Sequence, residues 1–151
     1  MTERFERFTL SISEVSRYWH KITTKEMAKY ELKGIHSMYL LTMLHYPNGI
    51  TAPQICALCG RDKADVSRMM TILEEKGMVT KEGTNQNMYR GTFKLTEKGK
   101  EAAEYVRARV TLAVEIAGKE LSNEKRAIFY ETLEMITENL RRLSEDGLPG
   151  E

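Results

Sequence analysis

The sequence has 151 residues, of which 41% are hydrophobic and 30% are charged. This length suits one domain with a single core, and the composition is that of a folded, helix-rich protein and excludes a disordered chain. No stretch approaches the roughly 20 apolar residues of a membrane span. The first residues lack the basic start and apolar centre of a secretion signal, so we expect a cytoplasmic protein with no membrane partner.

Charge is distributed unevenly along the chain, although the formal net charge is only +1. Residues 61–100 hold 9 Lys or Arg against 6 Asp or Glu, a net +3, whereas residues 101–151 hold 7 against 11, a net −4. A basic middle region agrees with phosphate contact there, but charge also segregates on surfaces that bind nothing.

A long first helix is predicted from residue 2 to about residue 29. Its apolar residues step alternately by three and four positions, as in a heptad stripe: Phe5, Phe8, Ile12, Val15, Trp19 and Ile22. Such a stripe requires a partner helix, either in the same chain or in a second subunit. A shorter, mostly buried helix is predicted from about Ile35 to the turn at residues 47–49.

Residues 51–78 predict two helices around a tight turn. The first ends at Gly60, because glycine adopts positive φ without steric penalty. Asp62 is the expected N-cap of the second helix, and Asp65 stands where a capping-box partner would reach back. We expect this second helix over about residues 63–77.

The second of these helices has two different faces. One sector is apolar and is predicted to pack on the core: Val66, Met69, Met70 and Leu73. The opposite sector carries short or hydrogen-bonding side chains around one guanidinium: Ala64, Ser67, Arg68 and Thr71. Such a face suits the major groove of DNA, where base edges are read at close range. The alternative is an ordinary solvated helix face.

A two-stranded hairpin is predicted after this helix. Residues 78–81 and 92–95 contain β-branched and aromatic side chains, with Gly, Asn and Gln between them. A helix-turn-helix, then a hairpin, then a helix capped by Thr96 is the order of a winged helix. We therefore predict a mainly α fold with a small β-hairpin wing, in which residues 35–98 form the winged helix-turn-helix.

Two long helical segments are predicted toward the C-terminus. The first is interrupted at Gly118, and Ser122 caps the second. The second helix carries another stripe with steps of four and three: Phe129, Leu133, Ile136, Leu140 and Leu143. Both ends of the chain, at about residues 1–30 and 100–145, therefore carry helices that need apolar partners.

The run of residues 50–79, together with the segment LTEKG at 95–99, resembles the MarR family of bacterial transcriptional regulators. The resemblance covers essentially the whole chain as one domain, residues 1–151. It implies a homodimer built from the terminal helices, which binds a pseudo-palindromic operator in double-stranded DNA. It further implies a repressor that a small effector releases.

The resemblance implies that each subunit places its 63–77 helix in a major groove and its wing along the flanking minor groove. The predicted DNA-binding residues are Lys63, Ala64, Ser67, Arg68, Thr71, Lys81, Asn87 and Arg90. The wing departs from the family, which usually has Asp-x-Arg where this chain has Asn87 and Tyr89. Either the register of the wing is shifted and Arg90 serves one place later, or the minor-groove contact is weaker and Lys81 or Asn87 makes some of it.

The resemblance also implies an effector site between the dimer helices and the DNA-binding part. The candidate liners are Trp19, His20, Met38 and Tyr39, for each of which ordinary packing is the alternative. A winged helix that binds another protein is the second function class, and salt dependence distinguishes it from a DNA reader. An enzyme is not predicted, because the sequence lacks a Gly-rich phosphate loop and a nucleophile elbow.

Cys56 and Cys59 form a C-x-x-C pair within the first helix of the helix-turn-helix. Core packing is the favoured role, because free cysteine behaves as a small buried hydrophobe. A thiol-based redox sensor is the alternative. No metal or cofactor is predicted, since His20, His36 and His45 show no second pair with ligand spacing.

Overall fold

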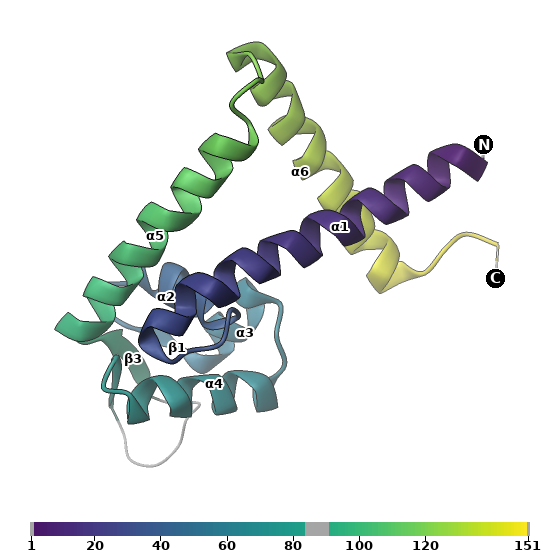
Figure 1. The fold of residues 1–151 in the computed structure, drawn as a ribbon. Coiled ribbons are helices and arrows are strands. Elements are labelled where there is room, and N and C mark those ends of the chain that lie inside the picture. The colour runs from purple at the N-terminus through teal and green to yellow at the C-terminus, as the bar shows by residue number, and fades with distance from the viewer. Residues whose placement is uncertain (1, 84–90, 151) are drawn as a thin grey trace. The chain divides into compact units, whose positions relative to one another are not determined.

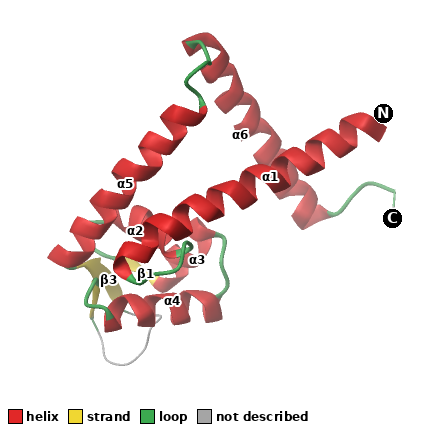
Figure 2. Cartoon of the chain, in the orientation of Figure 1, coloured by secondary structure: helices red, strands yellow, loops and turns green. Residues whose placement is uncertain are grey.

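The computed structural model describes residues 2–83 and 91–150. Contacts divide the chain into two compact units, residues 1–111 and residues 112–151. Helices make up most of both units, and the strands are short (Figure 1; Figure 2). In the described residues, no helix is both long enough and apolar enough to cross a membrane.

The order of elements is that of a winged helix-turn-helix with long flanking helices, as the sequence predicts. The first unit contains α1 (Thr2–Met27), the 3-10 turn η1 (Ala28–Tyr30), α2 (His36–Leu44), β1 (Ile50–Thr51), α3 (Ala52–Cys59), α4 (Lys63–Glu75), β2 (Val79–Glu82), β3 (Thr92–Leu95) and most of α5 (Glu97–Ala117). The second unit contains the end of α5 and all of α6 (Asn123–Asp146).

The predicted wing hairpin is confirmed. β2 and β3 are antiparallel, with Val79 opposite Leu95 and Glu82 opposite Thr92. Across the two strands, Lys94 Nζ lies 2.9 Å from a carboxylate oxygen of Glu82, the last residue of β2 before the loop. This cross-strand ion pair supports the register of the two strands.

β1 is a strand that the sequence pattern does not predict. Ile50 pairs with Phe93 on β3, so the sheet has the order β1, β3, β2. Thr51 then caps α3: its hydroxyl accepts from Gln54 N at 3.3 Å, and Gln54 Oε1 accepts from Thr51 N at 2.9 Å. This capping box joins the edge of the sheet directly to the first helix of the helix-turn-helix.

The core of the first unit lies where α2, α3, α4, the sheet and α5 meet. Its largest fully buried side chains include Tyr39, Leu40, Ile50, Ile55, Met70, Leu73, Met78 and Phe93. The predicted apolar sector of α4 is confirmed for Val66, Met70 and Leu73, while Met69 is only partly buried. α4 therefore turns its opposite face away from the core.

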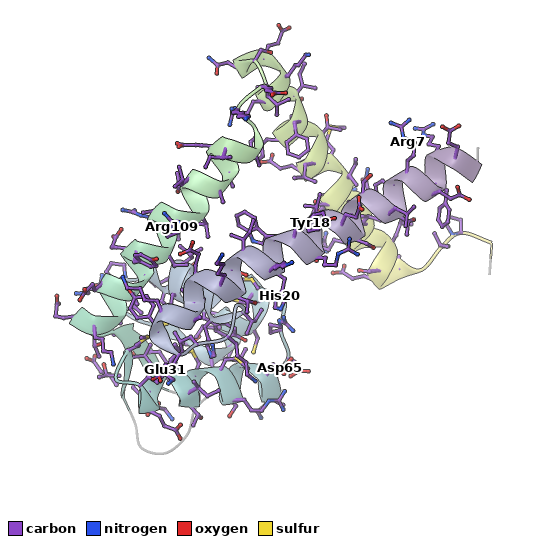
Figure 3. The ribbon with its side chains drawn as sticks, in the orientation of Figure 1. Arg7, Tyr18, His20, Glu31, Asp65 and Arg109 are labelled. Carbon is purple, nitrogen blue, oxygen red and sulfur yellow. The ribbon has the colours of Figure 1, made fainter. Side chains whose placement is uncertain are left out.

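The C-terminal end of α1 is attached to α5 through a carboxylate. Glu26 accepts a hydrogen bond from Tyr105 at 2.9 Å and another from Arg109 at 3.0 Å. The Arg109 hydrogen bond lowers the pKa of Glu26 below its usual value. The ammonium of Lys29 also lies 3.9 Å from the centre of the Tyr105 ring. Figure 3 shows Arg109 on α5 facing this end of α1.

The apolar stripe of α1 is exposed. The exposed fraction is 69% for Phe5 and 68% for Val15, and the remaining members of the stripe are exposed as well. Burial of one such side chain contributes roughly 1.5–3 kcal/mol. In the single chain, these side chains therefore do not contribute this stabilisation.

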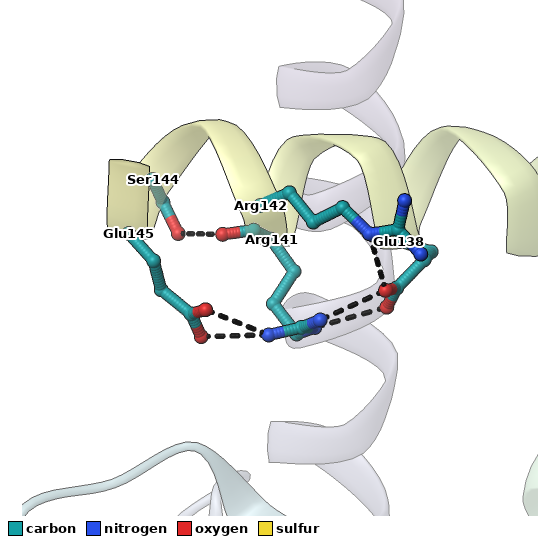
Figure 4. Close-up of polar contacts among 5 residues, drawn as sticks. All are labelled: Glu138, Arg141, Arg142, Ser144 and Glu145. Atoms are coloured by element: carbon teal, nitrogen blue, oxygen red, sulfur yellow. Dashed lines mark hydrogen bonds and ion pairs between the residues drawn. The ribbon is translucent and has the colours of Figure 1, made fainter. Parts of the chain in front are cut away.

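The helix α6 has the same character and contains no buried residue. Ion pairs cover its polar side (Figure 4): Glu138 accepts from Arg141 and Arg142, and Arg141 also donates to Glu145 at 2.8 Å. Its apolar side stays exposed, with Phe129 at 51% and Leu140 at 47%. α6 is thus an amphipathic helix whose polar face is satisfied and whose apolar face is not.

The start of α5 is fastened to the end of α4. Thr96 Oγ1 accepts from Gly99 N at 3.0 Å and donates to the carbonyl of Gly77 at 2.6 Å. Lys98 Nζ donates to the carbonyl of Lys76 at 2.8 Å. A Cβ on Gly99 would overlap the carbonyl oxygen of Met78, which is backbone and cannot move aside easily. Only glycine fits at this crossing.

We expect Gly99→Ala to lower the free energy of unfolding by at least about 2 kcal/mol, because the added methyl group forces the backbone apart. Urea unfolding followed by circular dichroism measures this change. Gly118→Ala is the matched control, since its Cβ would meet only the flexible end of Arg126 at 3.2 Å. Equal losses in the two variants would contradict the close approach at Gly99.

Candidate nucleic-acid interface

The helix α4 begins where the sequence predicts, and its first turn is capped. Gly60 ends α3 with a φ of 61°, and the Asp62 carboxylate then accepts from Asp65 N at 2.8 Å. The capping-box role expected of Asp65 is wrong. Its carboxylate does not reach back to the N-cap and instead receives the guanidinium of Arg68. The opposite charge three residues away, about one helical turn, is preferred over the backbone amide.

The outward face of α4 carries the predicted base-reading residues. Ala64, Arg68 and Thr71 are exposed, and Ser67 is partly exposed. The Thr71 hydroxyl donates to the carbonyl of Ser67 at 2.8 Å, which leaves its oxygen able to accept. Lys63 is exposed in the first turn. The sequence thus places short side chains and one long cation on a surface that can approach another molecule closely.

Arg61 is a basic residue at this surface that the sequence analysis did not select. Its side chain is 41% exposed, and its Nη1 lies 3.8 Å from Asp65. The spacing of four residues between Arg61 and Asp65 is the signal that would have found it. Together with Lys63 and Arg68, it places three cations within the first eight residues after Gly60.

The wing is described only in part. Lys81 lies on β2 and is partly buried, and its aliphatic chain runs beside Gly91. Asn87 and Arg90, the other predicted wing contacts, lie outside the described residues, as does Tyr89. Minor-groove contact by these residues therefore stays a prediction.

A cavity of about 570 Å³ lies between α1, α2 and the part of α5 near Val110. Trp19, His20 and Met38 line it, so three of the four candidate effector residues come together. Hydroxyl and imidazole groups of Ser16, Thr23, Ser37, Thr42 and His45 also line it, and the sequence analysis did not select them. The sequence gives little indication of these cavity-lining residues, because they come from two helices whose packing against each other the sequence does not specify.

Tyr39 does not line this cavity. Its side chain is fully buried in the core, since it projects about 100° around α2 from Met38. Its hydroxyl is buried without a hydrogen-bond partner in the described residues. Burial raises the pKa of Tyr39 to about 12, so the hydroxyl stays neutral.

The two cysteines are free thiols in different surroundings. Cys59 is buried, with its Sγ 3.6 Å from the Thr42 hydroxyl, and Cys56 is partly exposed. Burial raises the pKa of the Cys59 thiol, which disfavours the reactive thiolate. Within the described residues, no group of three or more His, Cys, Asp or Glu side chains is placed to hold a metal ion.

No protein-family model matches this sequence, and no curated protein sequence matches it. Solved structures do. One MarR family transcription regulator has a TM-score of 0.82 at 14% identity, with 97% of this chain and 96% of that chain covered. A MarR family regulator from Listeria monocytogenes, complexed with 26mer DNA, has a TM-score of 0.80 at 18% identity, covering 95% of this chain and 97% of that one.

A further similar structure is CouR from Rhodococcus jostii RHA1 bound to p-coumaroyl-CoA. Its TM-score is 0.73 at 19% identity, with 85% of this chain and 90% of that chain covered. At these identities the likeness shows the fold, which is the winged helix-turn-helix of MarR regulators.

We expect the buried thiol to be unreactive. At neutral pH, iodoacetamide should alkylate Cys56 at least several times faster than Cys59, because burial disfavours both the thiolate of Cys59 and the approach of the reagent. Mass spectrometry of Cys56→Ala and Cys59→Ala, each of which retains one thiol, gives the two rates. Faster alkylation of Cys59 would instead favour the thiol-sensor hypothesis.

Proposed function

We propose that this chain is a MarR-type transcriptional regulator, a homodimer that binds double-stranded DNA with sequence specificity and represses until a small effector releases it. The observation that carries the proposal is the outward face of α4. Ala64, Arg68 and Thr71 are exposed directly opposite the buried side of the helix. The same fold occurs in a regulator solved with DNA.

The dimensions of α4 suit a major groove. Its 13 residues span about 20 Å, and the groove is about 12 Å wide, which admits one helix. Ala64 and Ser67 allow the backbone to come close, and Arg68 can donate two hydrogen bonds to a guanine edge. Lys81, Asn87 and Arg90 then meet the flanking minor groove, where a narrow width strengthens the attraction for cations.

The exposed stripes of α1 and α6 support the homodimer. Each stripe is too regular and too apolar for a solvated face, and a second copy offers the same surfaces in return. Two-fold symmetry then presents two α4 helices to DNA. The operator accordingly has two half-sites whose centres lie about 34–36 Å, or one helical turn, apart.

The cavity lined by Trp19, His20 and Met38 supports an effector site. Its volume of about 570 Å³ falls within the roughly 300–1,000 Å³ usual for small-molecule pockets. Aromatic and thioether groups provide apolar contact, while hydroxyl and imidazole groups provide orientation. The neighbour CouR holds a bound acyl-CoA.

Two other functions fit the same sequence. A winged helix that docks on another protein needs no DNA target, and its apolar contact would depend little on salt. A DNA reader loses affinity steeply as salt rises, through counterion release. A thiol sensor is the other function, and the burial of Cys59 argues against it.

Selection of bound sequences from random duplex DNA tests the proposal, and Arg68→Ala tests its central contact. We expect a palindromic motif, and a loss of about 1–3 kcal/mol in operator affinity for Arg68→Ala with relaxed preference at one symmetric pair of positions. Binding isotherms at several salt concentrations measure both. Arg107→Ala removes an exposed arginine from α5 and should change nothing. Unchanged operator affinity in a folded Arg68→Ala dimer would favour the protein-docking alternative.

A charge in the α6 stripe should break the dimer. We expect Leu140→Glu to shift the protein from dimer to monomer in sedimentation at micromolar concentration, because a buried, unpaired carboxylate is costly. Ala127→Glu adds the same charge about 140° away around α6 and should leave the dimer intact. A parent protein that sediments as a folded monomer would refute the homodimer itself.

A further inference from the structure

One carboxylate at the start of α4 holds two arginines. Asp65 Oδ1 accepts from Arg68 Nη2, and Asp65 Oδ2 lies 3.8 Å from Arg61 Nη1. Asp65 has only 29% of its side chain exposed, whereas Arg61 has 41% and Arg68 has 64%. Figure 3 marks Asp65 at this end of α4. The acid thus lies beneath the two exposed cations of the candidate interface.

The first turn of α4 is also poorly suited to hold a phosphate. A helix N-terminus binds anions when its backbone N–H groups and dipole face an open site. Here the Asp62 carboxylate already takes the N–H of Asp65 at 2.8 Å. Residues 61–68 contain three cations and two carboxylates, so this segment carries a net charge of only +1. Its attraction for phosphate is correspondingly reduced.

We propose that Asp65 is a positioning residue that sets the sequence specificity of DNA binding. It fixes the direction of the Arg68 and Arg61 guanidinium groups and offsets their attraction for the phosphate backbone. This inference rests on the proposed function of α4 as a DNA-reading helix.

The physical basis of this role is a difference in binding free energy between operator DNA and unrelated DNA. A guanidinium has five N–H donors, and the contact with Asp65 uses one nitrogen of Arg68. The remaining donors can still meet a matching base edge. On unrelated DNA that gain is missing, while the repulsion between Asp65 and the phosphates persists. An unfavourable interaction retained on the wrong partner raises specificity.

Asp65→Asn should therefore bind unrelated DNA more tightly. We expect its affinity for scrambled duplex to rise about tenfold at low salt and the slope of log affinity against log salt to steepen by about 2 per dimer, because each subunit gains about one phosphate contact. The ratio of operator to scrambled affinity should fall about tenfold. Asp65→Glu retains the charge and should recover most of the ratio.

Glu74→Gln is the matched control, because it makes the same change in charge on the same helix without touching Asp65. If it raises affinity for scrambled DNA as much as Asp65→Asn does, net charge and not the contact is responsible, and the proposal fails. Unfolding of each variant by urea shows whether a change in binding merely reflects lost stability.

A measurement without DNA separates this proposal from the proposed function. Phenylglyoxal should modify Arg61 and Arg68 several times faster in Asp65→Asn than in the parent or in Glu74→Gln, as followed by mass spectrometry. Unchanged rates would show that Asp65 does not hold the arginines and would overturn the inference even if the operator binds. Faster modification in a protein that prefers no duplex sequence would overturn both the specificity role and the proposed function.

Discussion

The fold depends on the contact between the end of α4 and the start of α5. The last carbonyl groups of a helix lack partners within it, and here residues beyond the wing supply them. The Thr96 hydroxyl bonds to Gly77, and Lys98 bonds to Lys76. Because β3 lies between these two helices in the chain, the same contacts hold the base of the wing against α4. The position of the candidate reading helix relative to the wing therefore follows from a few hydrogen bonds and from the missing side chain of Gly99.

Stabilisation is divided unequally along the chain. The winged helix-turn-helix buries its own apolar residues around Tyr39, Phe93 and Met70, so a single chain forms this core. α1 contributes Met27 to that core and is tied to α5 through Glu26, but its residues 3–22 are exposed in the single chain. In the proposed dimer, the outer parts of α1 and α6 acquire their burial only from a second subunit. Folding of the winged helix-turn-helix and the proposed dimerisation thus depend on different apolar surfaces.

Local patterns predicted most of the fold. Gly60, Asp62, Thr96 and Ser122 act on the backbone within four residues, so their positions mark the helix ends correctly. Contacts between distant segments were harder to predict. The pairing of Ile50 with Phe93, the burial of Tyr39 away from the cavity, and the choice of Asp65 for arginines over the N-cap amide all depend on tertiary packing or on competition between partners. The outward exposure of Ala64, Arg68 and Thr71 followed from the pattern of one helix face, whereas several residues of the cavity, which more than one helix lines, were not predicted.

In the proposed regulator, the reduced positive charge at the start of α4 affects how the protein finds its operator. A regulator meets an excess of unrelated DNA, and every residence there delays arrival at the operator. Under the proposed role of Asp65, the carboxylate beneath the arginines would shorten those residences, because it would weaken their attraction for phosphates and leave the remaining guanidinium donors for base edges. Asp65 would then shorten the residence time on unrelated DNA more than it shortens the lifetime of the operator complex. In the proposed regulator, shorter residences on unrelated DNA would shorten the search for the operator.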